Sequence, residues 1–253
     1  MKALRKILQE ASYPLIVTAV ALALWYAAAA ATASEFIVPS PFAAIKRFFG
    51  LFAEKAFYAA LGSTLARSLI SYAVSFIAAL TFALAAMFSR PVRKLLSPLV
   101  SVCRALPTMA VVLLLVIWTG PKAAPVIVAL LVVLPTLYAS FYEAITGVDK
   151  DTVDMARIDG AGKIRLALGF YLPLAAPGAS RSAAGALSLT VKLMVAAEVL
   201  ANTAGSLGAM MQTARIYFET AELMALTVAT VLVSLLLEGV VYALLKLTFS
   251  DWK

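Results

Sequence analysis

Histidine is missing from this sequence, cysteine occurs once, and only 13% of the 253 residues are charged. The lack of histidine removes the commonest side chain for acid/base catalysis near neutral pH and for metal binding. The single cysteine, Cys103, excludes an internal disulfide. These shortages disfavour a hydrolytic or metal-dependent enzyme, so we expect no metal site. The chain instead has 63% hydrophobic residues in long runs, which is typical of a protein that crosses a membrane several times.

The net charge of +8 comes from basic residues in short clusters at the ends of apolar runs. This placement encodes orientation in a membrane, whereas a nucleic-acid-binding protein gathers its basic residues on one face, so we expect no nucleic acid partner. With both termini in the cytoplasm, 13 Lys and Arg residues lie inside and 5 lie outside, which favours that orientation. The prediction is an all-α, polytopic membrane protein with one domain over 1–253. Its six transmembrane helices are expected at about 13–33, 62–88, 96–118, 123–142, 179–201 and 223–245.

Two segments outside these spans carry helix signals. Ser40 and Pro41 predict the cap and first turn of a short helix on the outer membrane interface, with Phe42, Ile45, Phe49 and Phe52 on one face. On the cytoplasmic side, 143–178 predicts two short helices. Asp149 or Asp151 caps the first, Gly160 ends it, and Pro173 stops the second.

Within the spans, proline and small residues predict bends and close contacts. Pro107 and Pro135 lie inside the third and fourth spans, where a proline bends a helix; such a bend either lines a pathway or is an ordinary kink. Small residues recur at every fourth position in two spans, a pattern that lets helices approach closely, either in general packing or along a subunit interface or a transport pathway. These residues are Ser71, Ser75, Ala79 and Ala83 in the second span, and Gly178, Ser182, Ala186 and Thr190 in the fifth.

Ionisable residues at membrane depth are costly, so each one is a candidate for function. Lys192 and Glu198 are six residues apart in the fifth span and cannot pair along one helix face. We expect Glu198 to find a partner on another helix, with Arg104 as a candidate, and either to form a structural pair or to act in a gate. Lys192 and Arg104 either snorkel, form structural pairs or attract an anionic substrate. Arg67 is expected to snorkel toward the outer surface.

The cytoplasmic segment carries the most specific pattern. Gly160-Ala161-Gly162-Lys163 looks like the end of a phosphate-binding loop, but Arg157 and Ile164 stand where that loop needs Gly and Ser or Thr. The spacing fits another motif, E-A-A-x3-G-x9-I-x-L-P, and so resembles the EAA loop of ABC importer permeases. The matching positions, together with the Ala that follows the glycine, are Asp154, Met155, Ala156, Gly160, Ala161, Phe170, Leu172 and Pro173. Met155 and Phe170 depart from the usual Ala and Ile.

The resemblance covers most of the chain and points to the binding-protein-dependent permeases of the nitrate/sulfonate/taurine group, which includes permeases for thiamine precursors. Besides the loop, it rests on Arg104-Ala105-Leu106-Pro107, Val116-Ile117-Trp118-Thr119-Gly120, Pro177-Gly178, Ala197-Glu198, Gly205 with Gly208, and Trp252.

The resemblance implies a type I ABC importer permease fold in the bacterial cytoplasmic (inner) membrane. It implies a transport subunit that is not itself an enzyme and holds no cofactor, since ATP and Mg are bound by partner ATPase subunits on the cytoplasmic side. A solute-binding protein outside and a permease homodimer are the other implied partners, besides membrane lipid. The loop would couple ATPase closure to the fifth span, which carries Lys192 and Glu198.

Two other classes of protein stay open. An ion-coupled secondary carrier would use its ionisable span residues for the coupling ion, but its halves should repeat, and 1–125 and 126–253 show no repeat. A membrane enzyme needs a clustered nucleophile, base and acid, which the sequence does not offer. The basic residues within spans indicate a small anionic solute without naming it.

Overall fold

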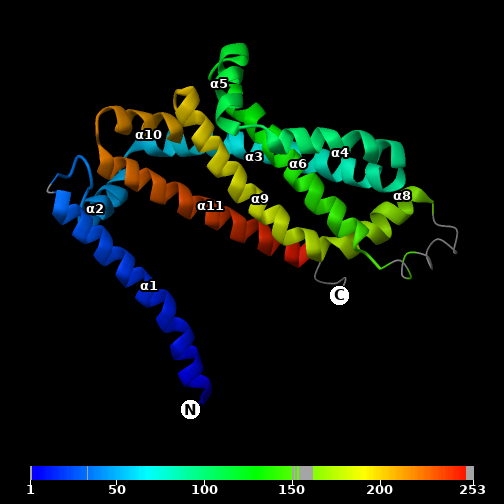
Figure 1. Cartoon of the computed structure of the whole chain (residues 1–253), viewed down its shortest axis with the longest axis horizontal. Coiled ribbons are helices and arrows are strands. Elements are labelled where there is room, and N and C mark those ends of the chain that lie inside the picture. Colours follow the sequence, from blue (N-terminus) through cyan, green and yellow to red (C-terminus); the bar gives the residue numbers. More distant parts are fainter. Residues whose placement is uncertain (1, 33, 150, 152, 154–161, 249–253) are drawn as a thin grey trace. The chain divides into compact units, whose positions relative to one another are not determined.

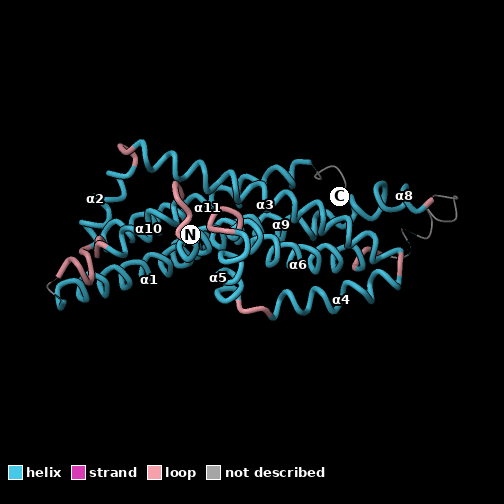
Figure 2. The backbone as a smooth tube through the Cα atoms, turned by 90° about the horizontal axis from the view of Figure 1, so that it is seen from above, coloured by secondary structure: helices cyan, strands magenta, loops and turns pink. Residues whose placement is uncertain are grey.

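A computed structural model describes residues 2–32, 34–149, 151, 153 and 162–248, and every element in these ranges is a helix (Figure 2). The chain divides into two compact units. One comprises 1–58 and 210–229, and the other comprises 59–209 and 230–253. The predicted all-α class is therefore confirmed for the described residues.

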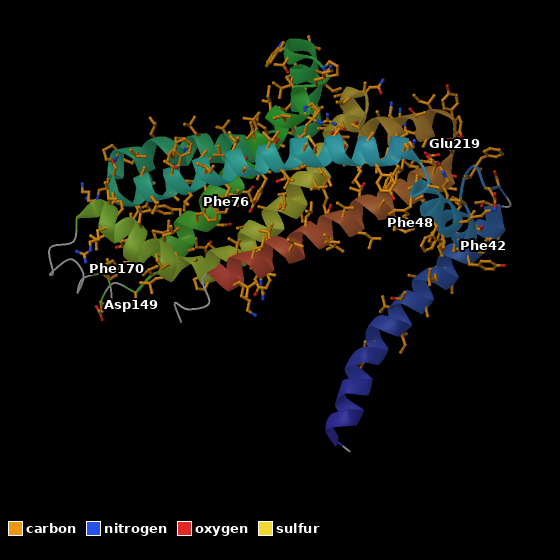
Figure 3. The ribbon with its side chains drawn as sticks, turned by 180° about the vertical axis from the view of Figure 1, so that it is seen from behind. Phe42, Phe48, Phe76, Asp149, Phe170 and Glu219 are labelled. Carbon is orange, nitrogen blue, oxygen red and sulfur yellow. The ribbon has the colours of Figure 1, made fainter. Side chains whose placement is uncertain are left out.

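The first unit contains α1 (Lys2–Thr32) and α2 (Pro41–Leu51). Ser40 caps α2 as predicted, because its hydroxyl accepts a hydrogen bond from Ala43 N at 3.2 Å and Pro41 occupies the first turn. The predicted apolar face is also present, with Phe42 77% exposed (Figure 3). Trp25 Nε1 donates to the carbonyl of Pro39 at 3.0 Å, which joins α1 to the segment before α2.

In the same unit, Arg47 of α2 donates hydrogen bonds to two carboxylates. It contacts Glu54 and lies 2.9 Å from Glu222, near the start of α11 (Thr220–Thr248). The hydrogen bond from Arg47 holds the pKa of the Glu54 carboxyl below its ordinary value. This ion-pair cluster fastens α2 to the first turn of α11.

The second unit is built around α6 (Ala124–Thr146) and α9 (Leu172–Ala201), which pack closely against each other. Leu137, Phe141 and Ile145 of α6 lie in its core with small residues of α9 and of α3 (Lys55–Phe88). The predicted stripe on α3 is fully buried at all four positions. On α9, Ala186 and Thr190 are buried while Gly178 and Ser182 are exposed. The small-residue pattern therefore marks a real helix contact on α3 and half of one on α9.

In the described part of the chain, four helices are long and apolar enough to cross a membrane: Lys55–Phe88, Ala124–Thr146, Lys163–Ala201 and Thr220–Leu247. A bent helix pair adds a fifth if it is one span, and the apolar part of α1, Ile16–Thr32, is shorter. The chain is thus a multi-pass membrane protein, and the count of six spans stays a prediction.

The bent pair corrects the expected third span. The sequence predicts one kinked helix over 96–118, but α4 (Arg90–Ala105) and α5 (Thr108–Thr119) are separate and meet at 96° (Figure 1). Leu106 has extended backbone angles because the ring of Pro107 disfavours a helical residue before it, and Pro107 then precedes α5. Pro135, by contrast, lies inside an uninterrupted α6.

The expected helix stop at Pro173 is wrong. A helical segment runs from Lys163 to Ala201 through α8 (Lys163–Leu166), the π-turn η1 (Ala167–Tyr171) and α9. In an α-helix the ring of Pro173 would collide with the carbonyl four residues earlier. The wider turn, in which Leu172 N donates to the carbonyl of Ala167, precedes the proline and lets the helix continue.

Candidate functional site

The predicted coupling segment is described only at its two ends. Asp154, Met155, Ala156, Gly160 and Ala161 lie outside the described residues. Asp149 follows the end of α6 (Figure 3). It accepts a hydrogen bond from Asp151 N at 3.4 Å, as expected of the cap. Leu172 and Pro173 form the first turn of α9, with Pro173 buried.

Both ends of this segment pack into the core of the second unit. Val153 is 1% exposed, and it belongs to the same cluster of buried residues as Leu166 and Tyr171. The ring of Tyr171 meets Phe88 of α3 edge to face, with ring centroids 6.1 Å apart. Close-packed side chains are nearly incompressible, so they transmit a displacement to their neighbours. A displacement of Val153, Leu166 or Tyr171 would therefore reach α3, α6 and α9 directly.

Glu198 of α9 is fully buried, and three residues donate hydrogen bonds to its side chain. Its carboxylate accepts hydrogen bonds from Arg67 at 2.6 and 2.9 Å, from the Thr64 hydroxyl at 2.8 Å, and from Gly208 N at 3.3 Å. Thr64 and Arg67 lie on α3, and Gly208 lies in the first turn of α10 (Leu207–Ile216). We call Thr64, Arg67, Glu198 and Gly208 the Glu198 network.

The turn after α9 explains why Gly208 reaches the carboxylate. Asn202 adopts a left-handed conformation with φ 50°, which ends α9, and Gly205 has φ 67°. Ser206 then accepts a hydrogen bond from Ala209 N at 3.0 Å, so it caps α10. At Gly208 a Cβ would lie 2.3 Å from the Cβ of Glu198, so only glycine fits there.

The network also explains how a carboxylate is accommodated at a fully buried position. A buried carboxylate is stable only when an opposite charge and hydrogen bonds replace its hydration. Arg67 supplies the charge, and Thr64 is itself fixed because it accepts a hydrogen bond from Leu207 N at 3.1 Å. Glu198 therefore clamps α3, α9 and the start of α10 together.

Two expectations about these residues are wrong. Glu198 pairs with Arg67 and not with Arg104, which is exposed in the last turn of α4. Arg67 does not snorkel, since it donates two hydrogen bonds to a buried group. The sequence held a signal for this pairing, because Arg67 extends the buried stripe of Ser71 and Ser75 by one four-residue step.

The structure does not bring the three predicted pathway residues together. Lys192 is exposed and Glu198 is buried, although both lie on α9. Arg104 joins neither of them. Glu238, a carboxylate in the second half of α11, was not weighed from the sequence, although a lone acid in the apolar run 223–245 is a clear signal.

No group of three or more His, Cys, Asp or Glu side chains suited to a metal ion occurs among the residues that the structure describes. The arrangement as a whole is a clamp between helices at the end of α9, with Leu166 and Tyr171 packed into the core before its start.

Comparison with known proteins agrees with this reading. Residues 75–249 match the family described as binding-protein-dependent transport system inner membrane component. A Haemophilus influenzae protein described as an ABC transporter permease is 26% identical over 166 residues, covering 65% of this chain and 67% of that protein. An Escherichia coli aliphatic sulfonates transport permease is 27% identical over 185 residues, covering 73% of this chain and 70% of that protein.

A Chloroflexus aurantiacus riboflavin transport system permease is 29% identical over 159 residues, covering 62% of this chain and 59% of that protein. Solved structures share the fold. A bacterial ABC transporter involved in the import of alginate aligns with TM-score 0.67 at 14% identity, over 97% of this chain and 99% of that chain. An amino acid ABC transporter with histidines aligns with TM-score 0.60 at 16% identity, over 82% and 96%. The chain belongs to the binding-protein-dependent inner membrane components, and so it is a permease component of an ABC importer.

Proposed function

We propose that this permease forms the alternating-access pathway for a small anionic solute that a solute-binding protein delivers from outside. The observation that carries the proposal is the family match over 75–249, which includes the loop spacing from Asp154 to Pro173. The anionic class is supported by Arg104 and Lys192, which are exposed cations on helices of the second unit. A relative named for aliphatic sulfonates supports the same class, and sulfonate, nitrate, taurine-like solutes or a vitamin precursor fit it.

Energy for transport comes from ABC ATPase subunits that bind ATP and Mg on the cytoplasmic side, and this chain needs no cofactor of its own. The ATPases dock on the coupling segment 143–178, through Asp154, Met155, Ala156, Gly160 and Ala161. Leu172 and Pro173 pass the movement on. Support comes from the packing of Val153, Leu166 and Tyr171 in one core and from the unbroken helical segment Lys163–Ala201.

The working assembly is a permease homodimer in the bacterial inner membrane, and each copy is one domain of six spans with cytoplasmic termini. The charge distribution supports this orientation. Glu198 acts as a gate within each copy, because its network joins the end of α9 to α3 and α10. Rotation of α9 would strain this network first, since it lies at the opposite end of α9 from Pro173.

The proposal is tested by Gly160→Arg. At the left-handed helix end that the sequence predicts for Gly160, a side chain would cost about 1 kcal/mol, and it would block close approach of a partner. We expect the variant to insert and fold normally, to lose copurification with the ATPase, and to lose uptake. Gly162→Ala is the matched control, since Gly162 has φ −68° and open space where the added methyl group would lie. Normal copurification and uptake with Gly160→Arg would overturn the docking assignment.

A further inference from the structure

A cleft of about 350 Å³ opens between α9 and α11 in the second unit. Its lining combines both signs of charge with small residues: Arg181, Ala184, Leu235, Glu238, Gly239 and Tyr242. Clefts of this volume are in the range that small ligands occupy. The cleft does not include any residue of the Glu198 network.

The two charges face the same cleft from different helices. The guanidinium carbon of Arg181 lies 6.0 Å from the centre of the Tyr242 ring, so one turn of α9 faces one turn of α11. One turn further along each helix, Glu238 Oε1 lies 3.9 Å from where a Cβ on Gly185 would be. Arg181 and Glu238 therefore stand about one helical turn apart along the groove.

Neither charge has an ionic partner among the described residues, where the ion pairs are those of Arg47 and Arg67. Both belong to helices long and apolar enough to cross a membrane. An unpaired charge in such a helix is costly, and Glu198 shows how this chain compensates one with its own residues. Arg181 is exposed beside the ring of Tyr242, and Glu238 is half-buried, so the hydrogen-bonding groups of both are open to a ligand in the cleft.

We propose that this cleft binds a zwitterion that carries an anionic group and a primary ammonium on a short linker. The guanidinium of Arg181 donates a pair of parallel hydrogen bonds to the anion. The ammonium donates to the Glu238 carboxylate, while the ring of Tyr242 holds the guanidinium of Arg181 beside the anion. Ala184 and Gly239 are small and leave room in the cleft for the linker of the ligand, between Arg181 and Glu238.

Two sources offer this chemistry, namely a free aminosulfonate or amino acid solute and the headgroup of phosphatidylethanolamine. The inference adds a ligand site to the proposed transport function. The ligand site is tested by a binding measurement that does not involve transport. A negative result in that measurement therefore does not affect the outcome of the coupling and uptake experiments.

The test uses the full chain in nanodiscs of phosphatidylcholine, titrated with 2-aminoethanesulfonate by calorimetry. We expect saturable binding, weakened at least tenfold for ethanesulfonate, which lacks the ammonium. Arg181→Gln and Glu238→Gln should each weaken binding at least tenfold, and Arg181→Lys should retain part of it. Arg93→Gln is the matched control, because Arg93 also lies over a tyrosine ring, that of Tyr142 at 5.3 Å, but outside the cleft.

A second arm tests the lipid source by native mass spectrometry of the same proteins in phosphatidylethanolamine nanodiscs. Retained lipid in the wild type and its loss in both Gln variants, without binding of the free solute, would assign the site to the headgroup. The proposal is overturned if neither ligand binds. It is also overturned if folded Arg181→Gln and Glu238→Gln bind either ligand as tightly as the control.

Discussion

Replacing Glu198 by Gln should destabilise the protein and impair uptake. The substitution removes the charge that compensates Arg67, and it places an amide N–H donor where the Thr64 hydroxyl and Gly208 N, or Arg67, need an acceptor. Removing one partner of a buried pair typically costs about 3–5 kcal/mol, because the other charge is stranded. The side chain of Arg67 retains 22% exposure, so we expect the lower end, about 3 kcal/mol.

The assay is the free energy of unfolding of the purified protein in mixed micelles, measured for both single variants and the double variant. Adding Arg67→Gln to Glu198→Gln should recover at least about 1 kcal/mol of the loss, since no stranded charge is left. Arg104→Gln is the control because Arg104 is exposed and contacts neither residue. In the Glu198→Gln background it should recover nothing.

Uptake measurements distinguish a purely structural role of Glu198 from a role in gating the pathway. If Glu198 gates the pathway, the Arg67→Gln, Glu198→Gln double variant regains stability while its uptake stays low. Recovery of both would reduce Glu198 to a structural partner. Additive losses in the two single variants, with no recovery in the double variant, would refute the reasoning about their pairing.

Three further predictions test other parts of the structure. Gly208→Ala should lower the free energy of unfolding by about 1–3 kcal/mol or more, because the added Cβ overlaps atoms of α9. Gly62→Ala is the control, since Gly62 has open space around it, and it should be neutral or slightly stabilising. Equal effects of the two substitutions would contradict the close packing at Gly208. The pKa of Glu54 is lowered in the folded protein. Its ion pair with Arg47 therefore stabilises the protein at pH values above the ordinary pKa of 4.5, and this stabilisation is lost as the pH falls through the folded pKa. The melting temperature of Glu54→Gln should therefore fall less than that of the wild type below about pH 4.5, and parallel curves would refute the role of this pair. In a background without the native cysteine, Lys163→Cys should react with an impermeant reagent only from the cytoplasm and Lys46→Cys only from outside, and labelling of both from one side would break the predicted topology.

Much of the local structure follows from the sequence. The start of α2 was predictable because Ser40 and Pro41 satisfy the free N–H groups of a first turn without help from the rest of the chain. The buried stripe on α3 was predictable because small side chains at every fourth position let helices approach closely, although the same pattern on α9 is buried at only two of its four positions.

What the sequence did not determine depends on tertiary contacts. Pro107 was expected to bend a helix, but whether a proline bends or ends a helix depends on the neighbouring residues, and here the chain turns by 96°. Pro173 was expected to end a helix, but a π-turn before it keeps the segment helical. Arg104 was the candidate partner of Glu198 and Arg67 was expected to snorkel, because charge pairing across helices depends on the rotation of each helix, which a stripe of small residues reports only indirectly.

We propose that this chain moves solute only when a partner ATPase hydrolyses ATP. The most direct measurement is uptake of a radiolabelled sulfonate into liposomes that contain the permease, with its ATPase, its solute-binding protein, ATP and Mg added or omitted in turn. We predict uptake only with all of these components present, and none when proton or sodium gradients replace ATP. Uptake by the permease alone, driven by such a gradient, would contradict the account and identify an ion-coupled carrier.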